Sequence, residues 1–231
     1  MILSQRLFAV SSLVTDGYRL ADIGTDHGFV PIFLVEEGRI PSAIAMDVRP
    51  GPLQRARDHI LEHALEDRIQ TRLSDGLTEL EAEEADTVLI AGMGGALTVR
   101  ILEEGSDPNL GIKELILQPQ SEIEIVRRYL EGSGWKIVEE KMVFEDGKYY
   151  PMMRCLPGTM DLTEMQARYG PCLMTQRPET WIAFLKWRKG ILKRNLAGLE
   201  RAAGERGELR RSEVIQELEE LDGLLINQSD S

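Results

Sequence analysis

The chain has 231 residues, of which 42% are hydrophobic, 21 are Gly, 10 are Pro and 2 are Cys. This composition excludes a disordered, collagen-like or disulfide-stapled chain and is typical of a globular protein with one or two domains. The formal charge is −12, and no stretch approaches the roughly 20 apolar residues of a membrane span. We therefore expect a cytoplasmic chain that does not bind membranes.

The first 150 residues alternate short β-rich runs with segments of helical pattern. An amphipathic helix is expected first, within Ile2–Val14. The alternation that follows is typical of βαβ units and predicts an α/β fold with a mostly parallel sheet. The predicted strands are Arg19–Ile23, Ala43–Asp47, Ile69–Leu73, Thr87–Ile90, Glu114–Leu117, Lys136–Phe144 and Tyr149–Cys155, and the predicted helices are Phe29–Glu37, Pro52–Ala64, Ala96–Glu104 and Glu122–Glu131.

The last two predicted strands are joined differently from the others. Only Glu145–Lys148 separates them, which is too short for a helical crossover, so they must form an antiparallel hairpin. A parallel sheet that ends in such a hairpin is typical of class I methyltransferases, whereas a dinucleotide-dependent dehydrogenase continues with parallel strands. We therefore predict a Rossmann-like, seven-stranded methyltransferase sheet with its last strand antiparallel.

From about Arg177 onward the apolar residues recur at helical spacings, which predicts an antiparallel helical coiled-coil hairpin with its reversal at Gly204–Gly207. Residues 1–150 carry 15 basic and 27 acidic residues, whereas residues 166–211 carry 11 basic and 4 acidic ones. A polyanion would dock on this basic helix; the alternative is a solvated helix whose charges only keep the protein in solution. We place a cofactor-binding domain in residues 1–158 and a helical domain in residues 159–231.

A loop with two glycines follows the first predicted strand and opens a helix. Asp26 stands at the second glycine position of the dinucleotide fingerprint, and Phe29 stands at the third. A carboxylate there suits a cationic ligand, such as the amino group and sulfonium of S-adenosyl-L-methionine. We therefore assign Asp22, Gly24, Asp26 and Gly28 to the cofactor, with a tight structural turn as the alternative.

The next four predicted strands also end on polar or glycine-rich residues, at the sheet edge where open α/β folds bind ligands. Asp47 is placed to accept hydrogen bonds from both ribose hydroxyls; helix capping is its alternative role. Asp75 and Gly76 are assigned to the cofactor's adenine, with a plain turn as the alternative. The remaining candidates are Gly92, Met93 and Gly94 for the cofactor, and Gln118 and Gln120 for the substrate.

Short motifs occur along nearly the whole chain, in the segments Leu3–Leu7, Ala21–Gly28 with Pro31, Ser74–Leu77, Gly92–Gly95, Gln118–Gln120, Glu145–Tyr150 and Tyr169–Pro171. Together these segments resemble the bacterial tRNA (adenine(22)-N(1))-methyltransferase family. The resemblance implies a Rossmann-like S-adenosyl-L-methionine domain, a C-terminal coiled-coil domain, and methylation of N1 of an adenine in the D-arm region of tRNA. The chain has Phe29 where many relatives have tyrosine, and Gln120 where relatives tend to have asparagine.

Catalysis of that reaction is mostly positioning, because the in-plane lone pair of adenine N1 attacks the sulfonium methyl without prior loss of a proton. Asp26 is the first candidate to stabilise the migrating positive charge, and His27 and Phe29 are expected to shape the pocket mouth. The residues expected to bind tRNA phosphates are Lys186, Arg188, Lys189, Lys193 and Arg194.

We expect no metal site and a monomer or weak dimer. His59 and His63 share one predicted helical face, but no third ligand accompanies them, so we interpret them as solvated side chains. Cys155 and Cys172 are too few and too isolated for a zinc cluster, and we interpret them as buried, reduced thiols.

Three alternatives stay open at this point. The first is a methyltransferase that acts on another RNA or on a small molecule, since it would share every cofactor feature. The second is a nicotinamide-dependent oxidoreductase, which Asp26 and the strand hairpin disfavour. The third is a non-catalytic module whose helical hairpin recruits a partner.

Overall fold

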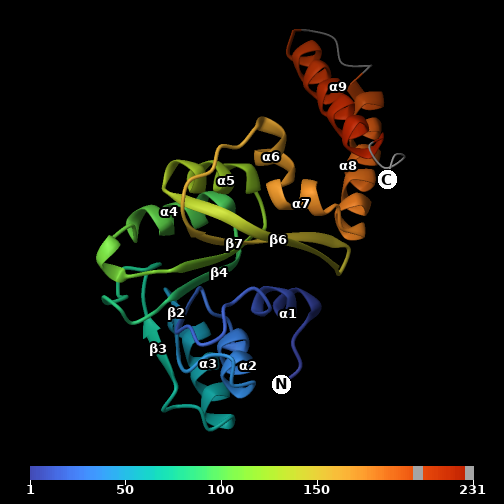
Figure 1. Cartoon of the computed structure of the whole chain (residues 1–231). Helices are drawn as coiled ribbons and strands as arrows, with labels where there is room; N and C mark the ends of the chain where they lie inside the picture. Colours follow the sequence, from blue (N-terminus) through green and yellow to red (C-terminus); the bar gives the residue numbers. More distant parts are fainter. Residues whose placement is uncertain (200–204, 227–231) are drawn as a thin grey trace. The chain divides into compact units, whose positions relative to one another are not determined.

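The computed structural model describes residues 1–199 and 205–226, and the chain divides into two compact units, Met1–Cys172 and Leu173–Ser231. The first unit contains one seven-stranded sheet with the order β3-β2-β1-β4-β5-β7-β6 (Figure 1). The predicted methyltransferase sheet is therefore confirmed. Its strands are β1 (Leu20–Ile23), β2 (Ala43–Asp47), β3 (Ile69–Leu73), β4 (Thr87–Met93), β5 (Glu114–Pro119), β6 (Trp135–Glu145) and β7 (Lys148–Pro157).

The first five strands are parallel to one another, and β7 lies antiparallel between β5 and β6. The β6–β7 hairpin turns through Asp146 and Gly147, which both have positive φ angles of 50° and 77°. Two such residues are what a two-residue hairpin turn requires. Because β7 runs antiparallel, the hairpin turn and the ends of β1–β5 lie at the same edge of the sheet, called the carboxyl edge below.

The strand predictions are correct to within three residues, and the largest difference lies at the end of β4. The prediction ended this strand at Ile90, but pairing with β5 continues to Met93. The register shifts between Ala91 and Met93, and Gly92 in between has a φ of +82°. Glycine tolerates this conformation, so the glycine-rich segment extends the strand through a bulge where the sequence indicated a loop.

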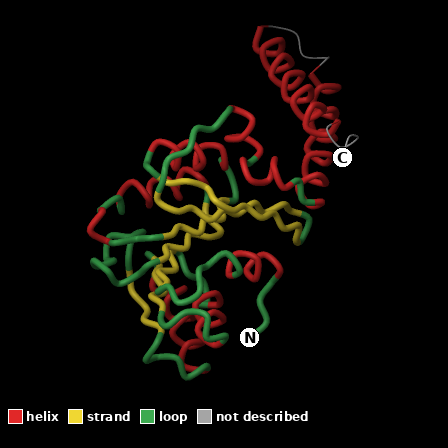
Figure 2. The backbone as a smooth tube through the Cα atoms, in the orientation of Figure 1, coloured by secondary structure: helices red, strands yellow, loops and turns green. Residues whose placement is uncertain are grey.

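Helices cover both faces of the sheet, as Figure 2 shows. Side chains that alternate along the strands feed two separate hydrophobic cores: Leu89 packs in one with Val10, Ile32 and Ile60, whereas Ile90 packs in the other with Ile101. The first core lies under α1 (Gln5–Ser11), α2 (Phe29–Glu36) and α3 (Pro50–Glu62), and the second lies under α4 (Gly95–Glu104) and α5 (Ile123–Gly132). A short 3-10 helix, η1 (Pro108–Leu110), precedes β5.

A buried ion pair holds the segment after β7 against the sheet unit. Arg127 on α5 contacts Glu140 on β6 at 2.8 Å, with exposures of 2% and 0%. The same guanidinium donates to the carbonyl oxygens of Ala167 and Arg168 at 3.0 and 3.1 Å, which belong to α6 (Glu164–Tyr169). Gly170 lies so close that a Cβ there would stand 2.7 Å from Glu140 Oε2. Residues up to the start of α7 (Pro171–Gln176) are therefore packed on the sheet unit.

The second unit contains the helix pair α8 (Glu179–Leu199) and α9 (Glu205–Ile226), which contact each other. Leu185 and Leu192 on α8 and Val214 and Leu221 on α9 are buried, as the predicted apolar spacing requires. The expected reversal at Gly204–Gly207 is wrong for its last residues, because α9 already begins at Glu205; Gly204 lies outside the described residues. No helix among the residues that the structure describes is long and apolar enough to span a membrane.

Candidate active site

A cavity of about 720 Å³ opens at the carboxyl edge of the sheet. Its volume lies within the usual range for small-molecule sites. Ten sequence-predicted candidates line it, together with Arg6, Leu7, Thr25, Val30, Val48, Arg49, Leu89, Ala91 and Leu97. The predicted residues among its lining are Asp22, Gly24, Asp26, His27, Phe29, Asp47, Gly92, Met93, Gly94 and Gln120.

Backbone hydrogen bonds hold the loop after β1 against β2. The backbone N–H groups of Gly24 and Thr25 both donate to the carbonyl oxygen of Met46, at 2.7 and 2.8 Å. Gly24 has a φ of +72°, and a Cβ there would lie 2.0 Å from the terminal methyl of Met93. A glycine is thus required for both the turn and the close approach of the Met93 side chain.

Two buried carboxylates stand side by side at the ends of β1 and β2. Asp22 is 8% exposed and Asp47 is 6% exposed. Burial raises the pKa of Asp22 to about 6, the neighbouring Thr25 hydroxyl opposes this rise in pKa, and the nearby charge of Asp47 adds to it. Asp47 Oδ1 accepts a hydrogen bond from the Arg49 N–H at 2.7 Å, next to the start of α3. The cavity therefore has a strongly acceptor-rich wall, and Asp47 also makes the capping-type bond considered as its alternative role.

Asp26 lies at the rim. Its side chain is 64% exposed and contacts Arg55 of α3 at 2.8 Å. The His27 Nε2 atom lies 3.5 Å from the same carboxylate. A negative charge at Asp26 is therefore balanced by a guanidinium that the sequence pattern did not reveal.

Three aromatic rings stack beside this rim. The His27 ring lies 5.0 Å from Phe29 and 5.1 Å from His59, with interplanar angles of 6° and 23°. His59 Nδ1 lies 3.0 Å from the His27 carbonyl oxygen, so the expectation of a solvated His59 is wrong. His63 likewise contacts Glu36, with 2.5 Å between Nδ1 and Oε1. The stack gives Phe29 a fixed, planar neighbour where it borders the cavity.

Four predicted site residues lie outside the cavity lining: Gly28, Asp75, Gly76 and Gln118. Asp75 forms an ion pair with Arg100 on α4, at 3.1 Å. Gly76 has a φ of +62°, and a Cβ there would lie 3.1 Å from Ile101, so this glycine serves the packing of α4. Gln118 is fully buried beneath Arg6, which donates to its Oε1 at 2.9 Å.

Sequence reasoning missed Arg6, Thr25 and Arg49 as parts of this cavity. A usable signal existed for Arg6, since it is the one basic residue in the apolar N-terminal helical segment. Thr25 stood inside the loop motif. Its Oγ1 atom is buried beside the Asp22 carboxyl, and neither this atom nor Nδ1 of His27 makes a hydrogen bond of normal geometry. Buried polar atoms without such a bond are rare in folded proteins and point to a bound molecule.

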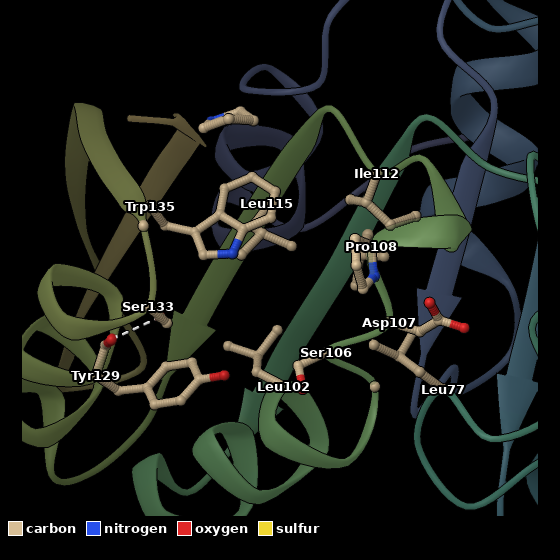
Figure 3. A pocket seen from close by; sticks show the side chains of 14 residues that line it. Leu77, Leu102, Ser106, Asp107, Pro108, Ile112, Leu115, Tyr129, Ser133 and Trp135 are labelled. Atoms are coloured by element: carbon tan, nitrogen blue, oxygen red, sulfur yellow. Dashed lines mark hydrogen bonds between the residues drawn. The ribbon is translucent and has the colours of Figure 1, made fainter. Parts of the chain in front are cut away.

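A second cavity, of about 310 Å³, lies at the opposite, amino edge of the sheet between the ends of α4 and α5 (Figure 3). Its walls are mostly apolar, with Leu102, Leu115 and Trp135 among them. The Tyr129 hydroxyl points toward Leu102 in Figure 3, and burial raises the pKa of Tyr129. No sequence-predicted site residue lines this cavity.

Comparisons with known proteins agree with this geometry. Residues 3–153 match the family model described as a methyltransferase domain. The tRNA (adenine(22)-N(1))-methyltransferase of Bacillus subtilis is 36% identical over 159 residues, which cover 69% of this chain and 67% of the relative. The chain belongs to this tRNA methyltransferase family.

Solved structures of family members share the fold over almost the whole chain. Sp1610 of Streptococcus pneumoniae is 34% identical with a TM-score of 0.91, covering 97% of this chain and 100% of that one. In complex with S-adenosyl-L-methionine it is 35% identical with a TM-score of 0.85 and the same coverage. The B. subtilis tRNA methyltransferase TrmK is 28% identical with a TM-score of 0.88, covering 97% of this chain and 99% of that one.

The cavity of this family member fits S-adenosyl-L-methionine by the chemistry of its lining. Asp22 and Asp47 offer buried acceptors, Thr25 offers a hydroxyl without a hydrogen bond of normal geometry, and Gly24 leaves the backbone accessible. Within residues 1–199 and 205–226, no group of three His, Cys, Asp or Glu side chains is placed to hold a metal ion. Both cysteines are free; Cys155 is buried, as expected, but Cys172 is only partly buried.

The five predicted phosphate-binding residues of α8 divide into two groups. Arg188 contacts Glu217 of α9 at 2.7 Å, and Lys189 contacts Asp222 of α9. Lys186, Lys193 and Arg194 are exposed. Because positions seven and eight residues apart share a helical face, these three side chains form one exposed basic strip, called the α8 strip below.

Proposed function

We propose that this chain transfers the methyl group of S-adenosyl-L-methionine to N1 of adenine 22 in tRNA. The observation that carries the proposal is the carboxyl-edge cavity, whose buried carboxylates and Thr25 hydroxyl belong to a chain of the tRNA (adenine(22)-N(1))-methyltransferase family. A methyltransferase acting on another RNA or on a small molecule would share the cofactor features of this cavity, so the choice of tRNA rests on membership of the tRNA methyltransferase family.

The cofactor would be held by residues of three strand ends. Asp47 would accept hydrogen bonds from the ribose hydroxyls, and Asp22 and the Gly24–Thr25 backbone would face the amino-acid part. Met93 and the bulge at Gly92 form the adjoining wall of the cavity, next to Gly24. When bound, S-adenosyl-L-methionine supplies an electrophilic methyl group on a sulfonium.

The chain's task at the acceptor is to present adenine N1 in line with that methyl group. Adenine N1 is normally engaged in stacking or pairing, so the nucleotide must be turned out of its stack. Phe29, braced by His27 and His59, supplies a flat apolar surface for the displaced base. Asp26 is our candidate for stabilising the positive charge as it moves from the sulfonium to the methylated base. Arg55 holds the Asp26 carboxylate in place.

Docking of tRNA is assigned to the helices of the second unit, which begins at Leu173 and not at residue 159 as the sequence indicated. The α8 strip offers three exposed cations, whereas Arg188 and Lys189 are engaged by α9 carboxylates. Phosphate contacts of this kind set affinity and position without reading sequence.

Methyl transfer is tested by incubating the purified chain with tritiated S-adenosyl-L-methionine and an unmodified tRNA transcript. We expect label in the transcript and N1-methyladenosine at position 22 on nuclease digestion and mass spectrometry. A matched transcript with guanine at position 22 should stay unlabelled. Equal labelling of both transcripts, or of neither, would contradict the proposal.

Docking is tested by reversing the charge of the α8 strip in K186E/K193E/R194E. We expect loss of tRNA binding in filter-binding assays, with S-adenosyl-L-methionine affinity unchanged in calorimetry. The control variant R57E/K136E reverses exposed charges of the sheet unit and should keep tRNA affinity. Parallel loss of tRNA and cofactor binding in the triple variant would show that the strip has no separate docking role.

A further inference from the structure

Arg6 and its neighbour Leu7 reach the cavity from α1, which precedes every strand of the sheet. Arg6 lies in the first turn of α1, whose N-cap Ser4 accepts a hydrogen bond from the Leu7 N–H at 3.3 Å. Its guanidinium stands beside the β4 bulge, since a Cβ on Gly92 would lie 3.9 Å from Arg6 Nη1. Arg6 thus lies on the side of β4 and β5, whereas Asp47 lies at the end of β2, on the other side of β1.

The guanidinium is held in place from two sides by uncharged groups. Nη1 donates to Oε1 of the fully buried Gln118 at 2.9 Å. The Cζ atom lies 5.5 Å from the centre of the Tyr150 ring on β7, a cation–π contact. Arginine has five N–H donors in a fixed plane, so with one donor on Gln118 others remain for a ligand.

Arg6 also lacks what most arginines of this unit have, a carboxylate partner for its side chain within the described residues. Glu145 reaches only its backbone N–H, at 3.4 Å. Arg49, the other arginine of the cavity lining, is 75% exposed and lies 3.6 Å from Asp47. A half-buried guanidinium fixed by neutral groups, at the end of a cavity otherwise rich in carboxylates, is built to receive an anion.

We propose that Arg6 binds the carboxylate of the amino-acid part of the cofactor. The inference rests on the proposed use of this cavity for S-adenosyl-L-methionine. That molecule carries two cationic centres, which suit the acidic wall, and one carboxylate, which needs a cation. Gln118 and Tyr150 are then positioning residues that act through Arg6. The buried Gln118 amide would serve to orient the Arg6 guanidinium toward the carboxylate.

The test compares two probes that differ in the amino-acid part. S-adenosylhomocysteine carries the carboxylate, whereas 5′-methylthioadenosine keeps the adenosine and thioether but lacks the amino-acid group. In calorimetry we expect Arg6→Gln to weaken S-adenosylhomocysteine binding roughly 10- to 100-fold, the effect of one charge-assisted contact. Binding of 5′-methylthioadenosine should change less than about twofold, because it makes no such contact.

Three further variants separate positioning from folding. Arg6→Lys keeps the charge without the planar fork and should recover part of the affinity. Tyr150→Leu removes the ring beneath the guanidinium and should weaken S-adenosylhomocysteine in the same direction, by a smaller factor. Arg57→Gln, on the exposed face of α3, is the matched control and should bind both probes as the wild type does. Thermal unfolding of each free variant identifies any loss of folded protein.

The outcomes distinguish this inference from the proposed function. If the wild type binds neither probe, the cofactor assignment of the cavity fails and the role of Arg6 falls with it. If the wild type binds both and Arg6→Gln affects them equally or not at all, only the Arg6 assignment is overturned. The assignment is also overturned if Arg6→Gln leaves S-adenosylhomocysteine binding intact and raises KM for tRNA alone, since the anion would then be a phosphate.

Discussion

The two edges of the same parallel strands treat their buried polar groups in opposite ways. At the amino edge, Glu114 is fully buried and accepts hydrogen bonds from Thr15, Thr87 and Arg154, the last at 2.6 Å. Beside it, the Arg19 guanidinium and Lys113 hold the pKa of Asp86 far below its usual range. Every one of these carboxylate oxygens has a partner inside the protein.

At the carboxyl edge the buried polar groups are only partly satisfied. Burial raises the pKa of Asp22 instead of lowering it, and the Thr25 hydroxyl makes no hydrogen bond of normal geometry. His27 holds a positive φ of 66° that glycine would adopt more readily. The amino edge is therefore optimised for the stability of the free protein, whereas the carboxyl edge is left incomplete until a ligand fills it.

The largest effect on this contrast is expected from Glu114→Ala. Removing the acceptor leaves Arg154 and two threonine hydroxyls without their partner, and loss of one member of a buried charge network costs about 3–5 kcal/mol of unfolding free energy. Urea denaturation should show this loss, while the stabilisation that S-adenosyl-L-methionine adds stays the same. A loss below about 1 kcal/mol would mean that the amino edge is not the stabilising one.

Unlike Glu114→Ala, Asp47→Asn should weaken cofactor binding and leave the free energy of unfolding unchanged. The amide oxygen can still accept from the Arg49 N–H, so the free protein should unfold as the wild type does. Losing a charged acceptor for two ribose hydroxyls should weaken cofactor binding by roughly 2–4 kcal/mol in calorimetry. Asp58→Asn, on the exposed face of α3, is the control; a stability loss in Asp47→Asn with unchanged affinity would place Asp47 among the structural carboxylates.

Titration of Asp22 should make both the stability of the free protein and its affinity for the cofactor depend on pH. Its pKa is raised to about 6 in the folded chain from an ordinary value of 3.8. The protonated form therefore favours folding; this contribution is complete below pH 3.8 and is lost as the pH rises through about 6. Binding of a cationic ligand needs the ionised form, so cofactor affinity should fall up to tenfold per pH unit as the pH drops below about 6.

Calorimetry between about pH 5 and about pH 7.5 measures this fall in affinity. Asp22→Asn should flatten the profile, because no carboxyl remains to titrate. The free variant should also be more stable than the wild type above pH 6, where the wild type carries a buried charge. An unchanged profile in Asp22→Asn would assign the pH dependence to another group.

Those elements of the fold that depend on local residue pattern could be predicted from the sequence. The buried run Ala43–Asp47 and the edge strand Ile69–Leu73 were both predicted to the residue, because each is a short strand-forming run that ends at turn-forming residues. The end of β4 was missed because Gly92 lies in a bulge whose existence depends on pairing with β5. Local propensity carries no information about such a pairing.

For the site, the sequence was sufficient for residues at strand ends and not for their partners. The Asp26–Arg55 and Arg6–Gln118 contacts join residues 29 and 112 positions apart, and only the fold brings them together. The five basic residues of α8 could not be sorted in the sequence, because the carboxylates that engage Arg188 and Lys189 lie on α9. Charge runs reveal a surplus of cations but not which of them remain exposed.

The smallest effect is expected from Thr25→Val, and it tests the incomplete edge most directly. The two side chains have nearly the same shape, and the substitution removes a hydroxyl that makes no hydrogen bond of normal geometry in the free protein, although it lies beside Asp22. The stability of the free protein should therefore change by less than about 1 kcal/mol. Cofactor affinity should fall by about 0.5–1.5 kcal/mol, the contribution of one neutral hydrogen bond. Paired urea denaturation and calorimetry measure both quantities. A destabilised free variant with normal affinity would mean that Thr25 belongs with the amino-edge groups, as a residue that serves folding alone.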